Sequence, residues 1–271
     1  MELESQAEAI RRRGLGIAAL SYDSVAVLAD FASRRGISFP LLSDPGSRII
    51  RAFGLLNPEY PEGDPAHGVP YPGTLVADHA GRVRQRFFES AYAERRTAAS
   101  ALVLQGDSPA GGVTARTPYF SVRIASSNGV ASPSNRITLV LELRLEPGLH
   151  AYAPGVKGYR PLRLRLDPDP LVTLHEPVYP EPRPYVFAPL RETVPVFEGS
   201  FRVLQDVTLA AGKAMAPRLA QPDPRLVLGG SLEYQVCSDR ICHPPGSLPV
   251  RWTLKLAPLD RERPRQELRR R

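Results

Sequence analysis

The chain has 271 residues, 42% of them apolar and 29 of them proline, which suits two ordinary domains with proline-rich connections. No apolar run approaches the roughly 20 residues that span a bilayer, and residues 1–5 lack the basic and apolar regions of a signal peptide. The formal net charge is +7, but the arginines alternate with apolar residues as on solvated sheet faces. We therefore expect a chain that does not itself span a membrane, has no export signal in these residues and does not bind nucleic acid.

The first hundred residues are predicted to alternate helix and strand. Helices are expected over residues 2–13, 24–36, 44–54 and 94–104. Short buried strands are expected over 15–20 and 39–42, and a hairpin over 74–77 and 82–88 with its turn at 78–81. Ser24 is the expected cap of the second helix, and Gly36 its end. Asp44 is the expected cap of the third helix, with Pro45 in the first turn.

Residues 106–112 interrupt this pattern with glycine, serine and proline, so we place a linker at 106–114. Beyond it the apolar residues alternate with mostly polar ones, as in Ile137, Leu139, Leu141, Leu143 and Leu145. Many short alternating strands separated by proline and glycine predict an all-β immunoglobulin-like sandwich over residues 115–257. The arginine-rich segment 258–271 is expected to be a basic disordered tail.

Cys237 and Cys242 are the two cysteines of the chain, so any thiol chemistry depends on them. They lie where one predicted strand ends and the chain turns back, and the four residues between them permit a disulfide. Three interpretations stay open at this point. The pair is a structural staple worth about 2 kcal/mol, a metal site to which His243 adds a third ligand, or a redox pair that exchanges disulfides.

Several motifs recur in order around the cysteines. They are Tyr234-Gln-Val-Cys237, Asp239 and Cys242-His-Pro-Pro245, preceded by Pro147–Gly155, Gly158–Leu162, Val178–Pro182 and Val194–Gly199. Together they resemble the N-terminal periplasmic domain of the bacterial thiol:disulfide interchange protein DsbD over about residues 115–257. The resemblance favours the redox pair and implies thiol–disulfide exchange in the periplasm or another extracytoplasmic compartment. It implies thioredoxin-fold partners or a membrane electron donor, and no cofactor or metal besides the redox-active disulfide.

The same resemblance implies roles for single residues. Cys237 and Cys242 would carry the exchange, with Cys242 as the attacking thiol and Cys237 as the resolving one. Supporting residues would be Tyr152, Tyr234, Asp239 and His243: the tyrosines as aromatic shields, Asp239 as an influence on thiol ionisation, and His243 in place of an aromatic residue. A loop that caps the cysteines would fall within residues 185–192. The alternatives are that the tyrosines fill a core and that Asp239 favours the turn.

The first domain resembles the alkyl hydroperoxide reductase/thiol-specific antioxidant family, a peroxiredoxin-like branch of the thioredoxin fold. The matching segments are Ser21–Asp23, Phe39–Asp44, Ala52–Gly54 and Tyr71–Asp78 with Gly81. The resemblance makes Pro72 the candidate for the family's cis proline. It also implies that the family's first strand and cysteine-bearing helix start would precede Glu2, so residues 1–105 are expected to lack both. Because no cysteine precedes Cys237, peroxidase activity of this domain is not expected.

The sequence thus predicts an incomplete thioredoxin-like α/β domain followed by a β-sandwich that exchanges disulfides through Cys237 and Cys242. The rival hypothesis is a noncatalytic protein-binding module, in which the disulfide is structural and the redoxin domain is degenerate. Whether the chain is an enzyme is left open between these two hypotheses, with a thiol–disulfide oxidoreductase favoured.

Overall fold

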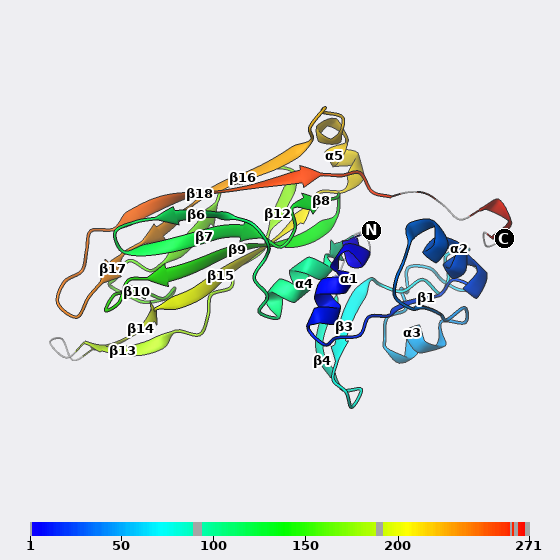
Figure 1. Cartoon of the computed structure of the whole chain (residues 1–271), viewed down its shortest axis with the longest axis horizontal. Helices are drawn as coiled ribbons and strands as arrows, with labels where there is room; N and C mark the ends of the chain where they lie inside the picture. Colours follow the sequence, from blue (N-terminus) through cyan, green and yellow to red (C-terminus); the bar gives the residue numbers. More distant parts are fainter. Residues whose placement is uncertain (1, 89–93, 188–191, 261, 263–264, 269–271) are drawn as a thin grey trace. The chain divides into compact units, whose positions relative to one another are not determined.

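The computed structural model describes residues 2–88, 94–187, 192–260, 262 and 265–268. The chain divides into two compact units (Figure 1). The first comprises residues up to Gln105 together with the segment from Leu259, and the second runs from Gly106 to Pro258. Among the described residues, none of the helices is long and apolar enough to cross a bilayer.

The described part of the first unit contains four α-helices, a short 3-10 helix (Gln266–Leu268) and five strands. Its helices are α1 (Glu2–Arg12), α2 (Val25–Arg35), α3 (Arg48–Ala52) and α4 (Ala98–Leu104). Its strands are β1 (Ala19–Ser21), β2 (Leu41–Ser43), β3 (Gly73–Ala77), β4 (Val83–Phe88) and the two-residue β5 (Arg95–Arg96). Strands β1 and β2 pair in parallel, and β3 and β4 form an antiparallel hairpin that belongs to a different sheet. The predicted hairpin is present, whereas the strands expected over 15–20 and 39–42 are shorter than predicted.

Helix ends in this unit follow local capping, with two departures from expectation. The Ser24 side chain accepts from the Val27 amide, and Gly36 ends α2 in the left-handed conformation, with φ at 59°. The Asp44 carboxylate accepts from three amides of α3, but the helix begins only at Arg48, so Pro45 precedes it. Helix α4 likewise begins later than predicted, after Thr97, whose side chain accepts from the Ser100 amide and thereby fixes the start.

The proline before the hairpin differs from the expectation set by the family resemblance. The Tyr71–Pro72 peptide bond is trans, and the described residues contain no cis peptide bond. Trans is the default for an X–Pro bond by about 0.5–1 kcal/mol, so a cis bond requires specific support from the surrounding structure. The assignment of Pro72 as a cis proline was therefore wrong.

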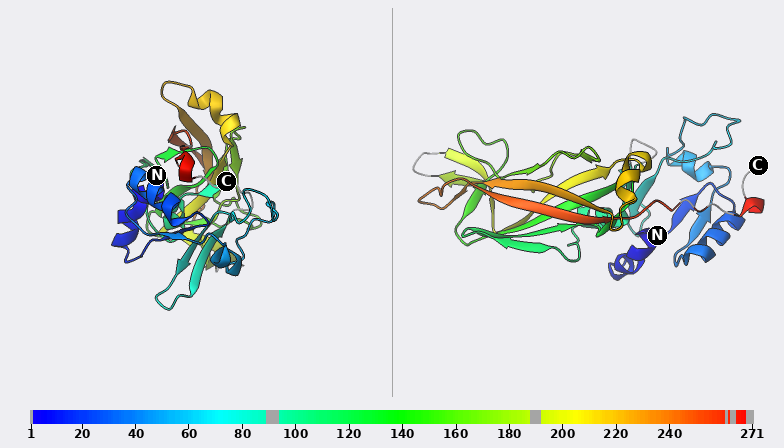
Figure 2. Two further views of the ribbon diagram at one scale, coloured as in Figure 1. Left: turned by 90° about the vertical axis from the view of Figure 1, so that its right-hand side faces the viewer. Right: turned by 90° about the horizontal axis from the view of Figure 1, so that it is seen from above.

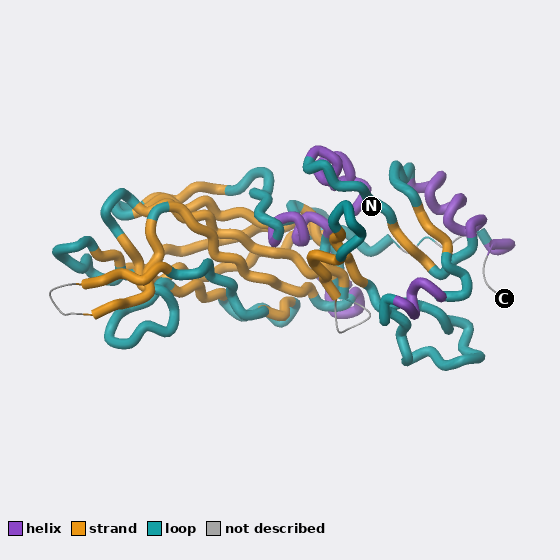
Figure 3. Tube along the Cα trace, turned by 90° about the horizontal axis from the view of Figure 1, so that it is seen from below, coloured by secondary structure: helices purple, strands orange, loops and turns teal. Residues whose placement is uncertain are grey.

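The second unit is almost entirely β (Figure 3). Its strands are β6 (Val113–Arg116), β7 (Phe120–Ser126), β8 (Val130–Ala131), β9 (Asn135–Leu145), β10 (His150–Tyr152), β11 (Arg163–Leu166), β12 (Val172–Leu174), β13 (Arg183–Phe187), β14 (Glu192–Glu198), β15 (Ser200–Leu209), β16 (Arg225–Tyr234), β17 (Val236–Cys237) and β18 (Gly246–Leu256), with one helix, α5 (Gly212–Leu219). Three sheets have the orders β12-β15-β9-β7-β6, β11-β16-β18-β8 and β13-β14-β10-β17. The long strands β16 and β18 run side by side through a ten-residue register (Figure 2).

One buried apolar cluster joins the three sheets of this unit. It takes Leu141 from β9, Trp252 from β18 and Val236 from β17, among many others. In β9 the alternating apolar side chains of residues 137–145 point into this cluster, because successive residues of a strand point to opposite faces. The indole nitrogen of Trp252 donates to the Ala125 carbonyl at 2.7 Å, which satisfies its polar atom inside the core. The short strands β10, β13, β14 and β17 gather at one end of the unit (Figure 1).

Two segments expected to be irregular are ordered in part. Residues 113 and 114, placed in the linker by composition, lie in β6, which pairs antiparallel with β7. A side chain at Gly112 would come within 2.8 Å of the Ile124 carbonyl, so glycine here permits close approach to a strand. The basic segment expected to be disordered forms ion pairs with α2, from Asp260 and Glu262 to Arg35. Composition predicts that both segments are flexible. Strand pairing orders residues 113 and 114, and ion pairs hold Asp260 and Glu262 against α2.

Candidate functional site

Cys237 and Cys242 form a disulfide, with 2.09 Å between the sulfurs and 4.0 Å between the Cα atoms. The two residues face each other as an isolated antiparallel bridge. Hydrogen bonds flank them on both sides, from the Ser238 amide to the Ile241 carbonyl at 2.8 Å and from the His243 amide to the Val236 carbonyl at 2.9 Å. The disulfide therefore closes a tight hairpin at the end of β17, as its sequence spacing predicted, and neither cysteine has a free thiol.

The two sulfur-bearing residues differ sharply in exposure. Cys237 is 1% exposed and lies in a small buried cluster with Tyr152, Val194 and Val196. Cys242, five residues further on, is exposed at the surface. A disulfide is cleaved by in-line attack of a thiolate on one sulfur, so access decides which sulfur is attacked. An external thiolate can reach Cys242, whereas the protein covers Cys237.

A pocket of about 210 Å³ opens beside Cys242. Its lining residues come from strands β10 and β13, the loop that follows β10 and the disulfide hairpin; they are His150, Tyr152, Tyr159, Tyr185, Phe187, Ser238, Arg240, Ile241 and Cys242. The registers of β10 with β14 and β17 place His150, Tyr152 and Cys237 on one face of the sheet. The opposite face carries Ala151 and Val236 into the main core. One sheet thus buries one face and uses the other for the pocket.

Tyr152 contacts both the disulfide and another aromatic residue of the pocket lining. Its hydroxyl lies 3.7 Å from Cys242 Sγ, and its ring stacks on Tyr159 with 4.2 Å between centroids. The Tyr159 hydroxyl donates to Glu192 at 2.7 Å, which raises the pKa of Tyr159 to about 12. Burial raises the pKa of Tyr152 as well. Both phenols therefore stay protonated at neutral pH and act as hydrogen-bond donors.

His150 lines this pocket, and the sequence analysis assigned it no role although it lies within the motif Pro147–Gly155. It is 2% exposed, and it pairs in register with Cys237 on β17 and with Glu198 on β14. Its Nε2 atom is buried and has no hydrogen-bond partner among the described residues. Burial lowers the pKa of His150, against an opposing effect of Glu198. The available signal was a histidine alternating with Tyr152 on a short strand, where an aliphatic residue would be ordinary.

The other predicted supporting residues, Tyr234, Asp239 and His243, do not line the pocket beside Cys242. Tyr234 packs edge-on against Phe120 at 4.9 Å, and the His243 ring lies 4.5 Å from that of Tyr119. Asp239 is exposed at the hairpin tip, 3.9 Å from the Arg240 guanidinium. A role for Asp239 in thiol ionisation stays a prediction. Of the expected cap loop, Tyr185 and Phe187 line the pocket, and residues 188–191 lie outside the described residues.

Replacing Tyr152 by phenylalanine is expected to slow alkylation of Cys242 in the reduced protein. The hydroxyl 3.7 Å from the sulfur can donate to the thiolate, and a hydrogen bond to the charged form lowers a pKa. Loss of this hydrogen bond should leave less thiolate at pH 7 and slow the reaction with iodoacetamide about three- to tenfold, which corresponds to a hydrogen bond of about 1 kcal/mol. Tyr159→Phe is the matched control, because that hydroxyl binds Glu192. Equal alkylation rates in wild type and Tyr152→Phe would contradict the assignment.

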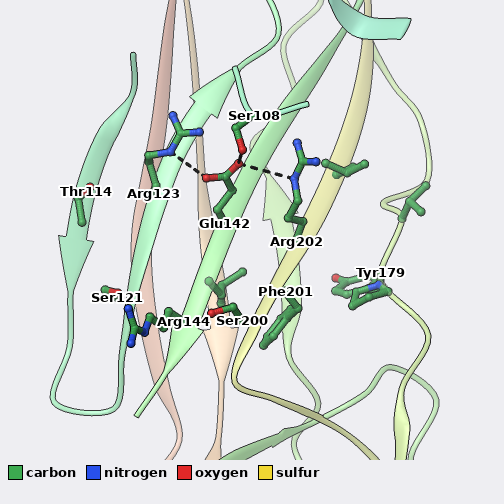
Figure 4. A pocket seen from close by; sticks show the side chains of 14 residues that line it. Ser108, Thr114, Ser121, Arg123, Glu142, Arg144, Tyr179, Ser200, Phe201 and Arg202 are labelled. Atoms are coloured by element: carbon green, nitrogen blue, oxygen red, sulfur yellow. Dashed lines mark hydrogen bonds and ion pairs between the residues drawn. The ribbon is translucent and has the colours of Figure 1, made fainter. Parts of the chain in front are cut away.

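A larger pocket, of about 780 Å³, lies over the outer face of β7, β9 and β15 (Figure 4). Part of its lining is an ion-pair network in which the Glu142 carboxylate accepts from Arg123 at 2.9 Å and from Ser108 at 2.7 Å, with Arg202 at 3.7 Å (Figure 4). Burial alone would raise the pKa of Glu142, but these hydrogen bonds and the two arginine charges outweigh it and lower the pKa. The network ties three strands together, and neither cysteine lines the pocket.

Glu142→Gln is expected to cost about 1 kcal/mol of unfolding free energy at neutral pH. The folded-state pKa of Glu142 is lowered, so its stabilisation is present above the unfolded pKa and is lost as pH falls through the folded pKa. The difference between the variant and wild type should therefore be largest near pH 7 and disappear in acid. Urea unfolding across this pH range measures it. Glu233→Gln, which removes an ion pair whose side chains are about half exposed, should change little at any pH.

The comparisons with known proteins show that the two units are similar to two different protein families. Residues 1–86 match the AhpC/TSA family model, and residues 123–250 match that of the thiol:disulfide interchange protein DsbD, N-terminal. Both resemblances noted in the sequence are thereby confirmed. The chain combines a redoxin-like N-terminal part with a β-rich, DsbD-like C-terminal domain.

Two putative peroxiredoxins of Mycobacterium tuberculosis, from strains CDC 1551 / Oshkosh and ATCC 25618 / H37Rv, are each 34% identical over 70 residues, 26% of this chain. The match spans 44% of each relative, so this chain covers less than half of their length.

Solved structures similar to this chain include two N-terminal domains. The periplasmic one of ScsB from Proteus mirabilis has 17% identity and a TM-score of 0.36, with 53% of this chain and 51% of that one covered. The DsbD N-terminal domain of Neisseria meningitidis, in the reduced form, has 16% identity and a TM-score of 0.30, with 43% and 80% covered.

Proposed function

We propose that the second unit exchanges disulfides with thioredoxin-fold proteins through Cys237 and Cys242, in an extracytoplasmic compartment. The observation that carries the proposal is the asymmetry of the disulfide, with Cys242 exposed beside an aromatic pocket and Cys237 buried behind it. A disulfide that only stabilises the fold does so whether or not its sulfurs are accessible, whereas exchange requires one accessible sulfur. The match of residues 123–250 to the DsbD N-terminal family supports the same function and compartment.

The exchange proceeds in two steps. In the reduced protein the Cys242 thiolate attacks a partner disulfide, which forms a mixed disulfide and releases one partner thiolate. Cys237 then attacks Cys242 Sγ, which restores the internal disulfide and releases the second partner thiolate. Two electrons pass to the partner, and the reverse sequence accepts two electrons from a thioredoxin-fold or membrane donor.

We further propose that the β-rich unit is an immunoglobulin-like sandwich and that the domain boundary falls between residues 105 and 106. The sandwich is supported by the core that the mostly antiparallel sheets share. The boundary is supported by the division of the chain into two compact units. The redoxin-like unit has no cysteine of its own, so peroxide reduction by a thiol in this chain would have to begin at Cys237 or Cys242.

The reduction potential of the pair tests the proposed exchange. The full chain is equilibrated with graded glutathione redox buffers, and the fraction of free thiols is measured by alkylation and mass spectrometry. A redox pair should have a midpoint above about −300 mV, whereas structural disulfides typically lie below it. A midpoint below that value would contradict exchange and favour a noncatalytic protein-binding module stapled by its disulfide.

A further inference from the structure

The resolving step requires proton removal from a thiol that water does not reach. Cys237 is 1% exposed, so its thiol is desolvated in the protein interior. A free thiol has a pKa near 8.5, and apolar burial raises it, which leaves little thiolate at neutral pH. The thiolate is the attacking species, so a buried thiol needs a nearby proton acceptor to resolve quickly.

His150 lies opposite Cys237 on the neighbouring strand. In the ladder between β10 and β17, side chains of directly opposed residues stand on the same face with Cβ atoms about 4.5–5.5 Å apart. His150 also lines the pocket beside Cys242. Its Nε2 atom is buried and has no partner among the described residues, so a ring nitrogen is available to take a proton.

The surroundings of the imidazole decide its charge state. Tyr152 on its own strand and Tyr185 on β13 face it, with ring centroids at 5.5 and 4.2 Å. Glu198 on β14 is its register partner and favours the charged ring, and Arg240 of the hairpin lines the same pocket. Desolvation outweighs Glu198, so the pKa of His150 is lowered and the ring is neutral at pH 7. A neutral imidazole accepts a proton, and Glu198 stabilises the imidazolium that results.

We propose that His150 is the proton acceptor for the Cys237 thiol when that thiol resolves a mixed disulfide held on Cys242. The proton moves from Cys237 Sγ to the imidazole, the new bond forms between the two cysteine sulfurs, and the bond from Cys242 to the partner sulfur breaks. The partner leaves as a thiolate, which takes up a proton from His150 or water. This role rests on the proposed exchange function and names the residue that sets its pH dependence.

The reagent dithiobis(nitrobenzoate) separates the two steps without any physiological partner. One equivalent is mixed with the fully reduced full-length chain. Attack by Cys242 releases a first coloured thiolate, and resolution by Cys237 releases a second. Wild type should show a second phase that stays constant from pH 8 down towards the pKa of His150 and then slows. In His150→Gln the second phase should be about 10²-fold slower at pH 7 and rise with pH up to the thiol pKa.

His79→Gln is the matched control, because His79 is exposed in the turn between β3 and β4 and does not line the pocket. It should keep the wild-type pH profile. A His150→Gln profile that superimposes on wild type would overturn the proposal. The reagent reacts with any accessible thiol, so failure to exchange with protein disulfides would count against the proposed function while leaving this measurement intact.

A measurement on the unmutated protein covers the case in which His150→Gln does not fold. The imidazole of His150 is titrated by nuclear magnetic resonance in the disulfide and the dithiol forms. If His150 accepts the proton of Cys237, its titration curve should differ between the dithiol form, in which that thiol is present, and the disulfide form. Superimposable titration curves in the two forms would overturn the proposal.

Discussion

Cys237→Ser is expected to accumulate a covalent complex with an oxidised thioredoxin-fold protein, and Cys242→Ser is expected to accumulate none. In the proposed exchange the exposed Cys242 attacks the partner, and without Cys237 the mixed disulfide has no resolving thiol inside the protein. In Cys242→Ser the remaining thiol is 1% exposed and out of reach of a partner. Non-reducing electrophoresis followed by mass spectrometry of the complex measures the effect.

The double variant Cys237→Ser/Cys242→Ser is the control for this trap, because it keeps the surface but has no thiol. Complexes formed by Cys242→Ser alone would reverse the roles of the two cysteines. If neither single variant forms a complex with a folded and oxidised partner, exchange is contradicted and the structural staple is favoured.

Trp252→Ala is expected to lower the free energy of unfolding of the β-rich unit by about 3–5 kcal/mol. Trp252 is 3% exposed in the core of the unit, and its removal leaves a cavity. It also removes the donor to the Ala125 carbonyl, which then stays buried without that hydrogen bond. Urea unfolding followed by circular dichroism measures the loss.

The fluorescence of the single tryptophan identifies which unfolding transition of the wild-type chain belongs to this unit. Val227→Ala is the control, because Val227 lies on the neighbouring β16 and is 44% exposed. It should change the free energy by no more than about 0.5 kcal/mol. A loss below about 1 kcal/mol for Trp252→Ala would be inconsistent with a well-packed tryptophan in this core.

Local signals predicted most of the secondary structure because their causes are local. Ser24 and Gly36 bound α2 as expected, since capping depends on a few adjacent residues. Alternating leucines predicted β9, because side-chain direction in a strand repeats every two residues. Local signals were poorer at the start of α3, where the cap residue is Ser47 and Asp44 reaches the amides from further upstream. Composition was poorer still at residues 113 and 114, which gain strand pairing from β7, a partner that lies outside the predicted linker.

By itself the sequence determined the thiol inventory, the disulfide spacing and the two family resemblances, because these reside in residue identity and order. Only the tertiary structure decided how the two sulfurs differ. Cys237 is buried and Cys242 exposed because β17 pairs with β10 while the returning arm of the hairpin stays at the surface. The same pairing brings His150 opposite Cys237 across 87 positions of sequence, and places Tyr152 against Cys242. Exposure and proximity of this kind arise from long-range strand register, which no local pattern of residues specifies.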